Sequence, residues 1–435
     1  MNPCFPIFSG LDACRHRLRE INAGKELSYL HDQEETVRAI IEAVRAEGDA
    51  ALLRFTREFD TVDLTRDRLR VSQDEVAAAR HRVDNAFVTA VEEAKQRVES
   101  YHRKQLPVSW LDYAPDGIAL GQKVTPMDRV GVYVPGGKAN YPSTVLMTSV
   151  PAKVAGVRQV ALVCPPGHEG EISPHVLVAA DVAGVDEIYR VGGAQAVAAL
   201  ALGTDTIPRV DKIVGPGNIY VVLAKKLLFG TVGIESLPGP SEVAILSDGT
   251  GRPEWIAADL MAQSEHGPDS CSLLITTSLQ QAESVVAAVD AALDRAPRAE
   301  HIRESFRQFG GALVVGSLEE AMRLLNEAAS EHVQVLLANP WEHLDRVRNA
   351  GAIFVGEYST VPLGDYLVGP SHVLPTATTA RFSSGLSVDD FVKKSSLISV
   401  SRRGAENLAD HLKTLTNAEN LPEHYQALQV RLKDK

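Results

Sequence analysis

The order of apolar and polar residues in the first hundred positions repeats with the period of an α-helix. One apolar stripe begins after Glu34, and a second runs through residues 74–102 in roughly helical steps. The first stripe consists of Val37, Ile40, Ile41 and Val44. Pro107 ends the second stripe, because proline removes a backbone donor and clashes with the preceding turn. The pattern predicts a mainly helical N-terminal segment over residues 1–107.

Beyond residue 107 the pattern changes to short β-type runs separated by glycine turns and helices. The expected strands are 130–134, 159–163, 188–191, 212–214, 243–246, 272–276, 312–315, 333–337 and 353–355. Strands that alternate with helices indicate parallel sheets with helices on both faces. We therefore predict an α/β fold with two Rossmann-like domains, at 108–240 and 241–385. The N-terminal segment packs on these lobes, and residues 386–435 form a helical tail.

Four glycine-rich turns are expected at the ends of strands in the first of these domains. They are Gly136–Gly137, Gly192–Gly193, residues 215–218 and residues 239–241. Glycine lets a backbone approach a ligand closely, and the helix that follows offers unpaired N–H groups to an anion. Each turn alone is most simply a strand-to-helix connection. Together they suggest a ligand crevice, although none matches the GxGxxG pattern, so the Rossmann motif is incomplete.

Charge and cysteine content narrow the class of protein. The formal net charge is −12 and no block of like charge occurs, so nucleic acid and acidic membrane surfaces are not expected partners. The four cysteines form no CxxC pair, which gives no support to a cysteine zinc site and fits a reducing cytoplasm. The sequence shows no signal peptide and no apolar run long enough for a membrane span. We expect a soluble cytoplasmic protein.

Two short combinations could carry chemistry. Gln263 and His266 are three residues apart in the last turn of a helix that Gly267-Pro268 stops, so both could reach one metal ion. Glu331 and His332 lie between a helix and a strand, where an acid and an imidazole could act as water activator and general base. Alone, the first pair is more simply a polar helix end and the second a pair of surface side chains.

Three further places hold ionisable residues near expected strand or helix ends. Asp365 lies in a loop beyond the strand at 353–355, and His372 follows it. Loops at strand ends are where α/β proteins place ligands. Near the chain end, Glu419 and His424 flank a Leu-Pro pair that could begin a helix. Neither of the last two can be told from a solvated helix face by itself.

Read together, these segments resemble the histidinol dehydrogenase family. The matching runs are GVYVPGG at 131–137, VGGAQA at 191–196, GPGN at 215–218, GPSE at 239–242, QSEHGPDS at 263–270, Glu331-His332, GDY at 364–366, HVLP at 372–375, and 419–424. They follow the family's order and span nearly the whole chain, so the joint pattern is specific although each piece is weak.

The resemblance implies a zinc- and NAD-dependent oxidation of L-histidinol through L-histidinal to L-histidine. It implies one Zn²⁺ per subunit in an intertwined homodimer, with the last metal ligand coming from the partner subunit. The implied zinc ligands are Gln263, His266, Asp365 and His424. The implied NAD positions are Tyr133, Gln195 and Asn218. The zinc ligands, Ser241, His332 and Glu419 are implied substrate contacts, and Glu331 with His332 is the implied catalytic pair.

Some positions depart from the family's usual residues. They are Glu235, Pro238, Ser330, Leu367, Val368 and Ser371. None is an implied ligand or catalytic position, but Ser330 and the bulky Leu367-Val368 could reshape the substrate pocket. Two alternatives therefore stay open: a related zinc- and NAD-dependent dehydrogenase of another small amino alcohol or polyol, and an inactive regulatory member. No implied base or metal ligand is missing, which favours the histidinol enzyme.

Overall fold

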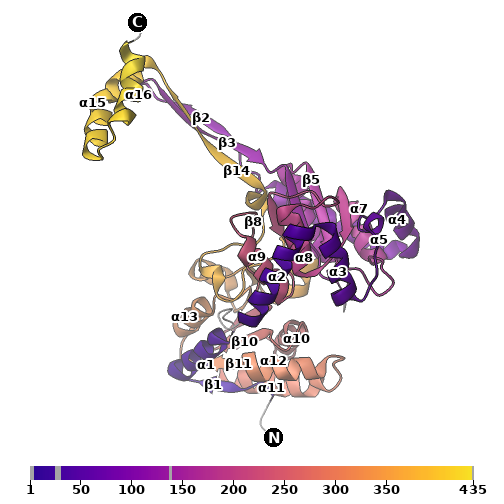
Figure 1. Ribbon diagram of the computed structural model, residues 1–435. Helices are drawn as coiled ribbons and strands as arrows, with labels where there is room; N and C mark the ends of the chain where they lie inside the picture. The colour runs from indigo at the N-terminus through magenta and orange to yellow at the C-terminus, as the bar shows by residue number, and fades with distance from the viewer. Residues whose placement is uncertain (1–3, 25–30, 137–139, 434–435) are drawn as a thin grey trace. The chain divides into compact units, whose positions relative to one another are not determined.

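The computed structural model describes residues 4–24, 31–136 and 140–433 (Figure 1). The chain divides into two compact units, and each is described by itself. The first unit consists of Met1–Gln105 and Asp128–Phe391, and the second of Leu106–Met127 and Val392–Lys435. The predicted division at residues 107/108, 240/241 and 385/386 follows the sequence pattern, whereas these two units follow the contacts between residues. The four-part division therefore stays a prediction.

A six-stranded, fully parallel sheet forms one half of the first unit, in the order β1-β11-β10-β9-β12-β13. Its strands are β1 (Ile7–Ser9), β9 (Glu242–Ser247), β10 (Cys271–Thr276), β11 (Gly311–Val314), β12 (His332–Leu336) and β13 (Ala352–Val355). The helices α1 (Leu11–Ala23) and α13 (Leu318–Ala328) share one apolar cluster with the sheet. The helices α10 (Pro253–Ser264), α11 (Leu279–Leu293) and α12 (Ala299–Phe309) share a second cluster. Burial on both sides explains why these strands are almost continuously apolar.

A five-stranded parallel sheet forms the other half, in the order β6-β5-β4-β7-β8. Its strands are β4 (Arg129–Tyr133), β5 (Gln159–Cys164), β6 (Glu187–Arg190), β7 (Lys212–Val214) and β8 (Gly233–Ile234). The helices α2 (His31–Glu47), α3 (Asp49–Asp60), α8 (Gly193–Leu202) and α9 (Ile219–Leu228) build one large apolar cluster with it. Further helices of this half are α5 (Asn85–Arg103), α6 (Pro142–Ala155) and α7 (Pro174–Ala183), which pack against one another.

The α/β class and its parallel sheets are confirmed, and each predicted strand forms within one residue of its expected bounds. The helical stripe expected over 74–102 is instead broken into α4 (Gln73–Ala79) and α5. The break has a local cause, because Ser72 forms a capping box with Glu75 and Asp84 caps α5 by accepting from the N–H of Phe87. Two new helix starts therefore interrupt one apolar pattern.

The second unit is a three-stranded antiparallel sheet with two helices. β3 (Ile118–Pro126) pairs with both β2 (Trp110–Tyr113) and β14 (Val392–Val400). The helices α15 (Arg402–Ala418) and α16 (Pro422–Lys433) follow. The tail is thus helical from residue 402 on, but it opens with a strand that the sequence pattern did not suggest. That strand reads VKKSSLISV and is exposed after its first residue, so it lacks the burial that produces a clear apolar period.

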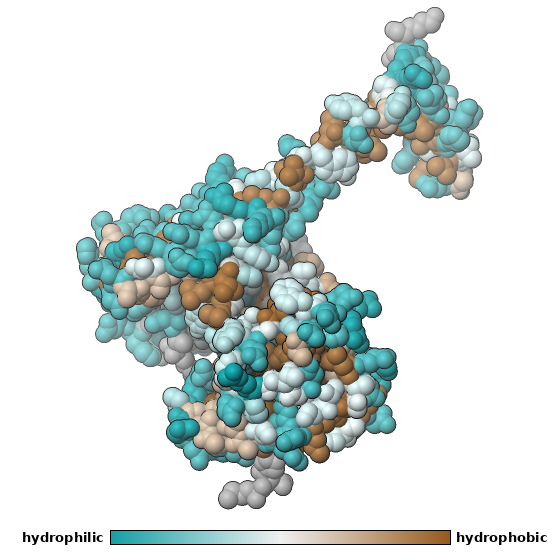
Figure 2. Space-filling model, turned by 180° about the vertical axis from the view of Figure 1, so that it is seen from behind, coloured by the Kyte–Doolittle hydropathy of each residue, from teal (hydrophilic) through white to brown (hydrophobic). Residues whose placement is uncertain are grey.

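Many large apolar side chains of the second unit face outward. Figure 2 shows them as brown groups along the sheet and on the helices. They include Val108, Trp110, Tyr113, Leu120, Ile398, Leu415 and Leu421. No helix within the described ranges combines the length and the apolar character that crossing a bilayer requires.

Candidate functional site

A cavity of about 360 Å³ in the first unit is lined by residues from the edges of both parallel sheets. From the five-stranded sheet come the turns at the carboxyl ends of β4 and β7, which include Pro135 and Asn218. From the six-stranded sheet come residues at the amino ends of strands. These are Ser241, just before β9, and Glu331 and His332, at the start of β12. His266, Asp365 and His372 also line the cavity.

Two details differ from the sequence expectation. The turn at 239–241 leads directly into β9, so it lies at the amino end of a strand rather than after one followed by a helix. Asp365 lies in a short helix, α14 (Val361–Tyr366), rather than in an open loop. Thr360 and Pro362 favour a helix start there, because proline suits the first turn. The second glycine of the predicted turn Gly136–Gly137 lies outside the described residues.

His332 is held at both ring nitrogens. Its Nδ1 donates to the carbonyl oxygen of Glu242 at 2.9 Å, and its Nε2 lies 3.3 Å from Oδ1 of Asp365. The carboxylate of Glu331 is 3.4 Å from the same ring and accepts from the backbone N–H of Glu242 at 2.9 Å. Because the proton on Nδ1 is hydrogen-bonded to the Glu242 carbonyl, Nε2 is the nitrogen that can exchange a proton.

The three ionisable groups shift one another's pKa values. Burial raises the pKa of Glu331 to about 7. Burial alone would lower the pKa of His332, but the Glu331 and Asp365 carboxylates outweigh it and raise the pKa to about 9. Burial alone would also raise the pKa of Asp365, yet the hydrogen bond and charge of His332 hold it below its usual value. A carboxyl with a pKa near neutrality next to an imidazole is suited to acid-base catalysis.

Gln263 brings an unusual buried amide to this region. It lies on α10, its side chain is only 2 % exposed, and within the described chain neither its Oε1 nor its Nε2 has a hydrogen-bond partner. One turn further, Nδ1 of His266 lies 3.2 Å from the carbonyl oxygen of Gln263, leaving Nε2 as the other ring nitrogen. A buried amide without a partner is costly, so the chemistry of this position suits a bound ligand.

The donor set fits a divalent cation. An amide oxygen of Gln263, a ring nitrogen of His266 and the carboxylate of Asp365 are all ligand types that zinc accepts. Within the described ranges no three His, Cys, Asp or Glu side chains are placed to hold an ion by themselves. The implied set draws only two such residues from the first unit, so it needs the amide and a further donor.

On the five-stranded sheet the implied cofactor residues cluster around the turns after β4, β6 and β7. The hydroxyl of Tyr133 accepts from the N–H of Gly193 at 3.1 Å, and burial raises the pKa of that hydroxyl. Gln195 is 1 % exposed, and its Oε1 has no partner among the described residues. Asn218 caps α9 by accepting from the N–H groups of Tyr220 and Val221.

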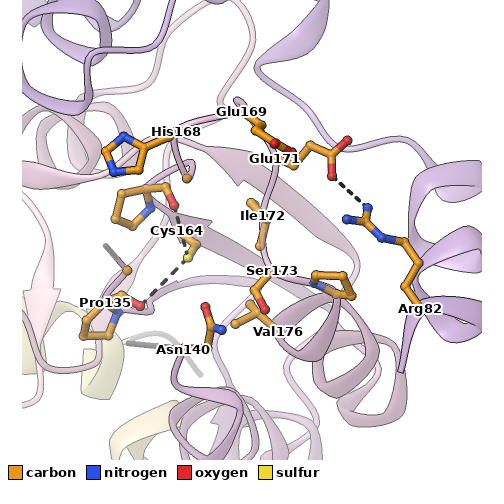
Figure 3. Close-up of a pocket in the computed structure, with 14 residues that line it drawn as sticks. Arg82, Pro135, Asn140, Cys164, His168, Glu169, Glu171, Ile172, Ser173 and Val176 are labelled. Carbon is orange, nitrogen blue, oxygen red and sulfur yellow. Dashed lines mark hydrogen bonds and ion pairs between the residues drawn. The ribbon is translucent and has the colours of Figure 1, made fainter. Parts of the chain in front are cut away.

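A second, smaller cavity of about 250 Å³ opens beside the first at the carboxyl ends of β4 and β5 (Figure 3). Pro135 lines both cavities. In the second, the thiol of Cys164 donates to the carbonyl oxygen of Pro135, and Glu171 pairs with Arg82 at 2.7 Å on the rim. Burial raises the pKa of the thiol to about 12, so Cys164 is an inert buried group, as its apolar surroundings in the sequence suggest.

The sequence analysis assigned no role to several residues that shape the site. His372 donates from Nδ1 to the carbonyl oxygen of Asp365, its Nε2 lies 3.2 Å from the Thr144 hydroxyl, and burial lowers its pKa. Glu242 contacts both Glu331 and His332. Beneath the turn that begins at Gly215, Lys225 and Glu235 form a fully buried ion pair. Only the HVLP and GPSE runs hinted at the first two, and no sequence pattern marked the third.

Glu419 and His424 belong to the second unit. Glu419 ends α15, His424 lies in the first turn of α16, and both are exposed there. The helix expected to begin at Pro422 is confirmed. The group around His332 in the first unit is assembled without these two residues.

Comparison with known proteins identifies the family. The histidinol dehydrogenase family model matches residues 25–432. Histidinol dehydrogenase from Synechococcus sp. is 49 % identical, with 92 % of each chain covered, and that from Moorella thermoacetica is 51 % identical, covering 91 % of this chain and 93 % of the relative. The crystal structure of histidinol dehydrogenase from Elizabethkingia anophelis superposes with a TM-score of 0.94 at 33 % identity, covering 100 % of this chain and 99 % of that one. The chain belongs to the histidinol dehydrogenase family.

Proposed function

We propose that this protein oxidises L-histidinol through L-histidinal to L-histidine with NAD, the final steps of histidine biosynthesis. The observation that carries the proposal is one cavity lined by Glu331, His332, Asp365 and His266, together with the buried amide of Gln263, three residues before His266, which has no partner among the described residues. The sheet opposite supplies backbone turns suited to a dinucleotide.

Gln263, His266 and Asp365 would hold a zinc ion, with His424 of the partner subunit as the fourth ligand. Support comes from the ligand types and from the buried Oε1 of Gln263, for which no partner exists among the described residues. When bound, zinc would hold the imidazole and amine of histidinol and thereby orient the carbon that reacts.

Tyr133, Gln195 and Asn218 would contact NAD. Pro135 lines both cavities, so an extended dinucleotide can place its nicotinamide in the larger one and continue into the smaller one. The partnerless Oε1 of Gln195 is available to a donor on the cofactor.

His332 and Glu331 would divide the proton transfers. In the first oxidation NAD would accept a hydride from the alcohol carbon, and Nε2 of His332 would take the hydroxyl proton. Where a cation engages Asp365, the pull of this carboxylate on the His332 proton weakens, which frees Nε2 to accept. Glu331 then takes a proton from the water that adds to the aldehyde. A second NAD would accept the hydride of the hydrate, whose hydroxyl protons pass to solvent, so that L-histidine and two NADH form in total.

Ser241 lines the same cavity and would contact the substrate. Glu419 would do so from the partner subunit of a homodimer. The outward-facing apolar side chains of the second unit support such an association, because exposed apolar surface of this extent usually marks an interface.

The deciding experiment measures histidinol-dependent NAD reduction with and without a chelator. We expect two NADH per histidinol, loss of activity on chelation and recovery when zinc is restored. A preference for another amino alcohol or polyol would reject histidinol as the substrate. Absence of any dehydrogenase activity in the zinc-loaded protein would favour the regulatory alternative.

A further inference from the structure

We propose that Glu242 is a positioning residue that locks Glu331 and the turn at residues 376–378 into one arrangement, and thereby sets the rate of aldehyde oxidation. The inference rests on the proposed function. Glu242 is the first residue of β9, is completely buried and stands next to Ser241. It is not an implied ligand, base or substrate contact.

Glu242 and Glu331 hold each other reciprocally. The backbone N–H of Glu242 donates to Oε2 of Glu331 at 2.9 Å, and the backbone N–H of Glu331 donates to Oε2 of Glu242 at 3.2 Å. The carbonyl oxygen of Glu242 also accepts from Nδ1 of His332 at 2.9 Å. One residue therefore fixes the side chain and backbone of Glu331 as well as the tautomer of the neighbouring imidazole.

The other carboxylate oxygen holds a strained turn. Oε1 of Glu242 accepts from the N–H of Ala377 at 3.0 Å, and the neighbouring Thr376 lines the active cavity. Ala377 and Thr378 have φ values of 50° and 65°, a left-handed conformation that is unfavourable for alanine and more so for β-branched threonine. Such a turn persists only where its surroundings hold it. The hydroxyl of Thr376 adds a second tie by accepting from the N–H of Gly239.

The chemistry of the position requires a carboxylate. Two backbone N–H groups, from Glu331 and Ala377, point at one side chain that water does not reach. An ionised carboxylate accepts at both oxygens, whereas an amide accepts at one and presents N–H₂ to the other donor. Glu242→Gln keeps the volume but forces one of these two contacts apart.

The test compares the two oxidations in the zinc-loaded, full-length enzyme. Histidinol and histidinal are supplied separately, and kcat, the KM for NAD and metal content are measured for wild type and Glu242→Gln. We expect kcat for histidinal to fall by roughly tenfold to a hundredfold, within the range of an acid-base contribution. The kcat for histidinol should change by less than about threefold, which is small beside an acid-base contribution. Metal content should stay constant, and free histidinal should accumulate.

Glu235→Gln is the matched control. Glu235 is also a buried glutamate that accepts from a backbone N–H, that of Gly215 at 2.8 Å, but it belongs to the cofactor side. It should change stability and the KM for NAD while leaving the ratio of the two oxidation rates unaltered.

Equal slowing of both oxidations by Glu242→Gln, or an unchanged ratio, would overturn the positioning role. If that variant does not fold, Glu242→Asp serves instead: it keeps the charge but is too short to reach both N–H groups, and it should lower the same ratio. Wild-type protein that fails to oxidise histidinol would refute the proposed function itself, a result separate from the ratio in the variants.

Discussion

Two of the buried glutamines, Gln195 on α8 and Gln263 on α10, show how differently the two sides of the cavity are built. Gln195 and Gln263 are 1 % and 2 % exposed, and each has an amide oxygen without a partner among the described residues. Gln195 lies in the first turn of α8, two residues after Gly193, whose N–H donates to the Tyr133 hydroxyl, whereas the backbone carbonyl of Gln263 contacts the His266 ring. The same residue type at the same depth is thus suited to a neutral cofactor contact on one side and to a cation on the other.

The comparison extends to the sheet edges. The five-stranded sheet offers the carboxyl ends of its strands, with glycine turns and backbone N–H groups. The six-stranded sheet offers amino ends, with Glu242, Glu331 and His332 at or just before the first strand positions. We infer that the backbone at the five-stranded sheet binds the cofactor, whereas buried ionisable side chains at the six-stranded sheet transfer protons.

Removing the base on the charged side should have the largest effect. His332→Asn keeps a polar group of similar reach but cannot exchange the proton at Nε2, so turnover should fall by about 10² to 10⁴-fold. Zinc content, measured by metal analysis, should remain near that of wild type because His332 is not among the proposed ligands. Near-normal turnover would remove His332 from its assigned role.

On the side of the five-stranded sheet, a buried ion pair supports the turn that begins at Gly215. Nζ of Lys225 is fully buried and donates to Glu235 and to the carbonyl oxygen of Gly215. Lys225→Met leaves Glu235 as an uncompensated buried charge, which should lower the free energy of unfolding by about 3–5 kcal/mol. Denaturant titration measures this change. The double variant Lys225→Met/Glu235→Leu should recover much of it, and no recovery would mean that the pair's charge is not the cause.

Exchanging each glutamine for leucine tests the contrast directly. Gln263→Leu should reduce zinc affinity by more than about tenfold to a hundredfold, the loss seen when only an outer partner of a metal site is removed. Gln195→Leu should raise the KM for NAD and leave zinc binding alone. Metal titration and cofactor kinetics on both variants give the answer. Similar effects of the two changes would erase the distinction between the sides.

The smallest effect should come from Asp60, an ionisable residue on the side of the five-stranded sheet, where the implied cofactor residues are uncharged. Asp60 has a buried Oδ2 without a partner in the described chain, and burial raises its pKa from 3.8 to about 6. A folded-state pKa above the unfolded value means that the folded protein binds more protons between these limits, so stability falls as pH rises through that window. Asp60→Asn should therefore unfold at a higher temperature than wild type at pH 7 and at a similar one near pH 4. Thermal unfolding at both pH values tests this prediction. A difference in unfolding temperature that persists at low pH would mean that titration of Asp60 is not its cause.

The sequence predicted what depends on local period and missed what depends on tertiary placement. Strands such as β9 and β10 are apolar throughout because both faces are covered, and that pattern is visible along the chain. The exposed β14 has no such pattern and was expected to be helical.

In the site, the family resemblance identified residues that the structure gathers at one cavity, among them Asn218, Ser241, His266 and Asp365. The GPSE run includes Glu242 but assigns it no role, because a glutamate at the start of an apolar strand acquires meaning only when Glu331 and Ala377 are brought against it.

The pairing of β3 with β14 joins two distant parts of the polypeptide along nine consecutive residue pairs, from Ile118–Val400 to Pro126–Val392. During synthesis on the ribosome, β2 and β3 emerge long before β14, so their apolar faces, including Trp110 and Leu120, wait without their third strand while the whole of the first unit folds. Contacts this remote in sequence form slowly and leave strand edges open to wrong partners. A nascent chain interrupted before residue 392 would therefore carry the β2–β3 hairpin with one strand edge unpaired, as a target for chaperones.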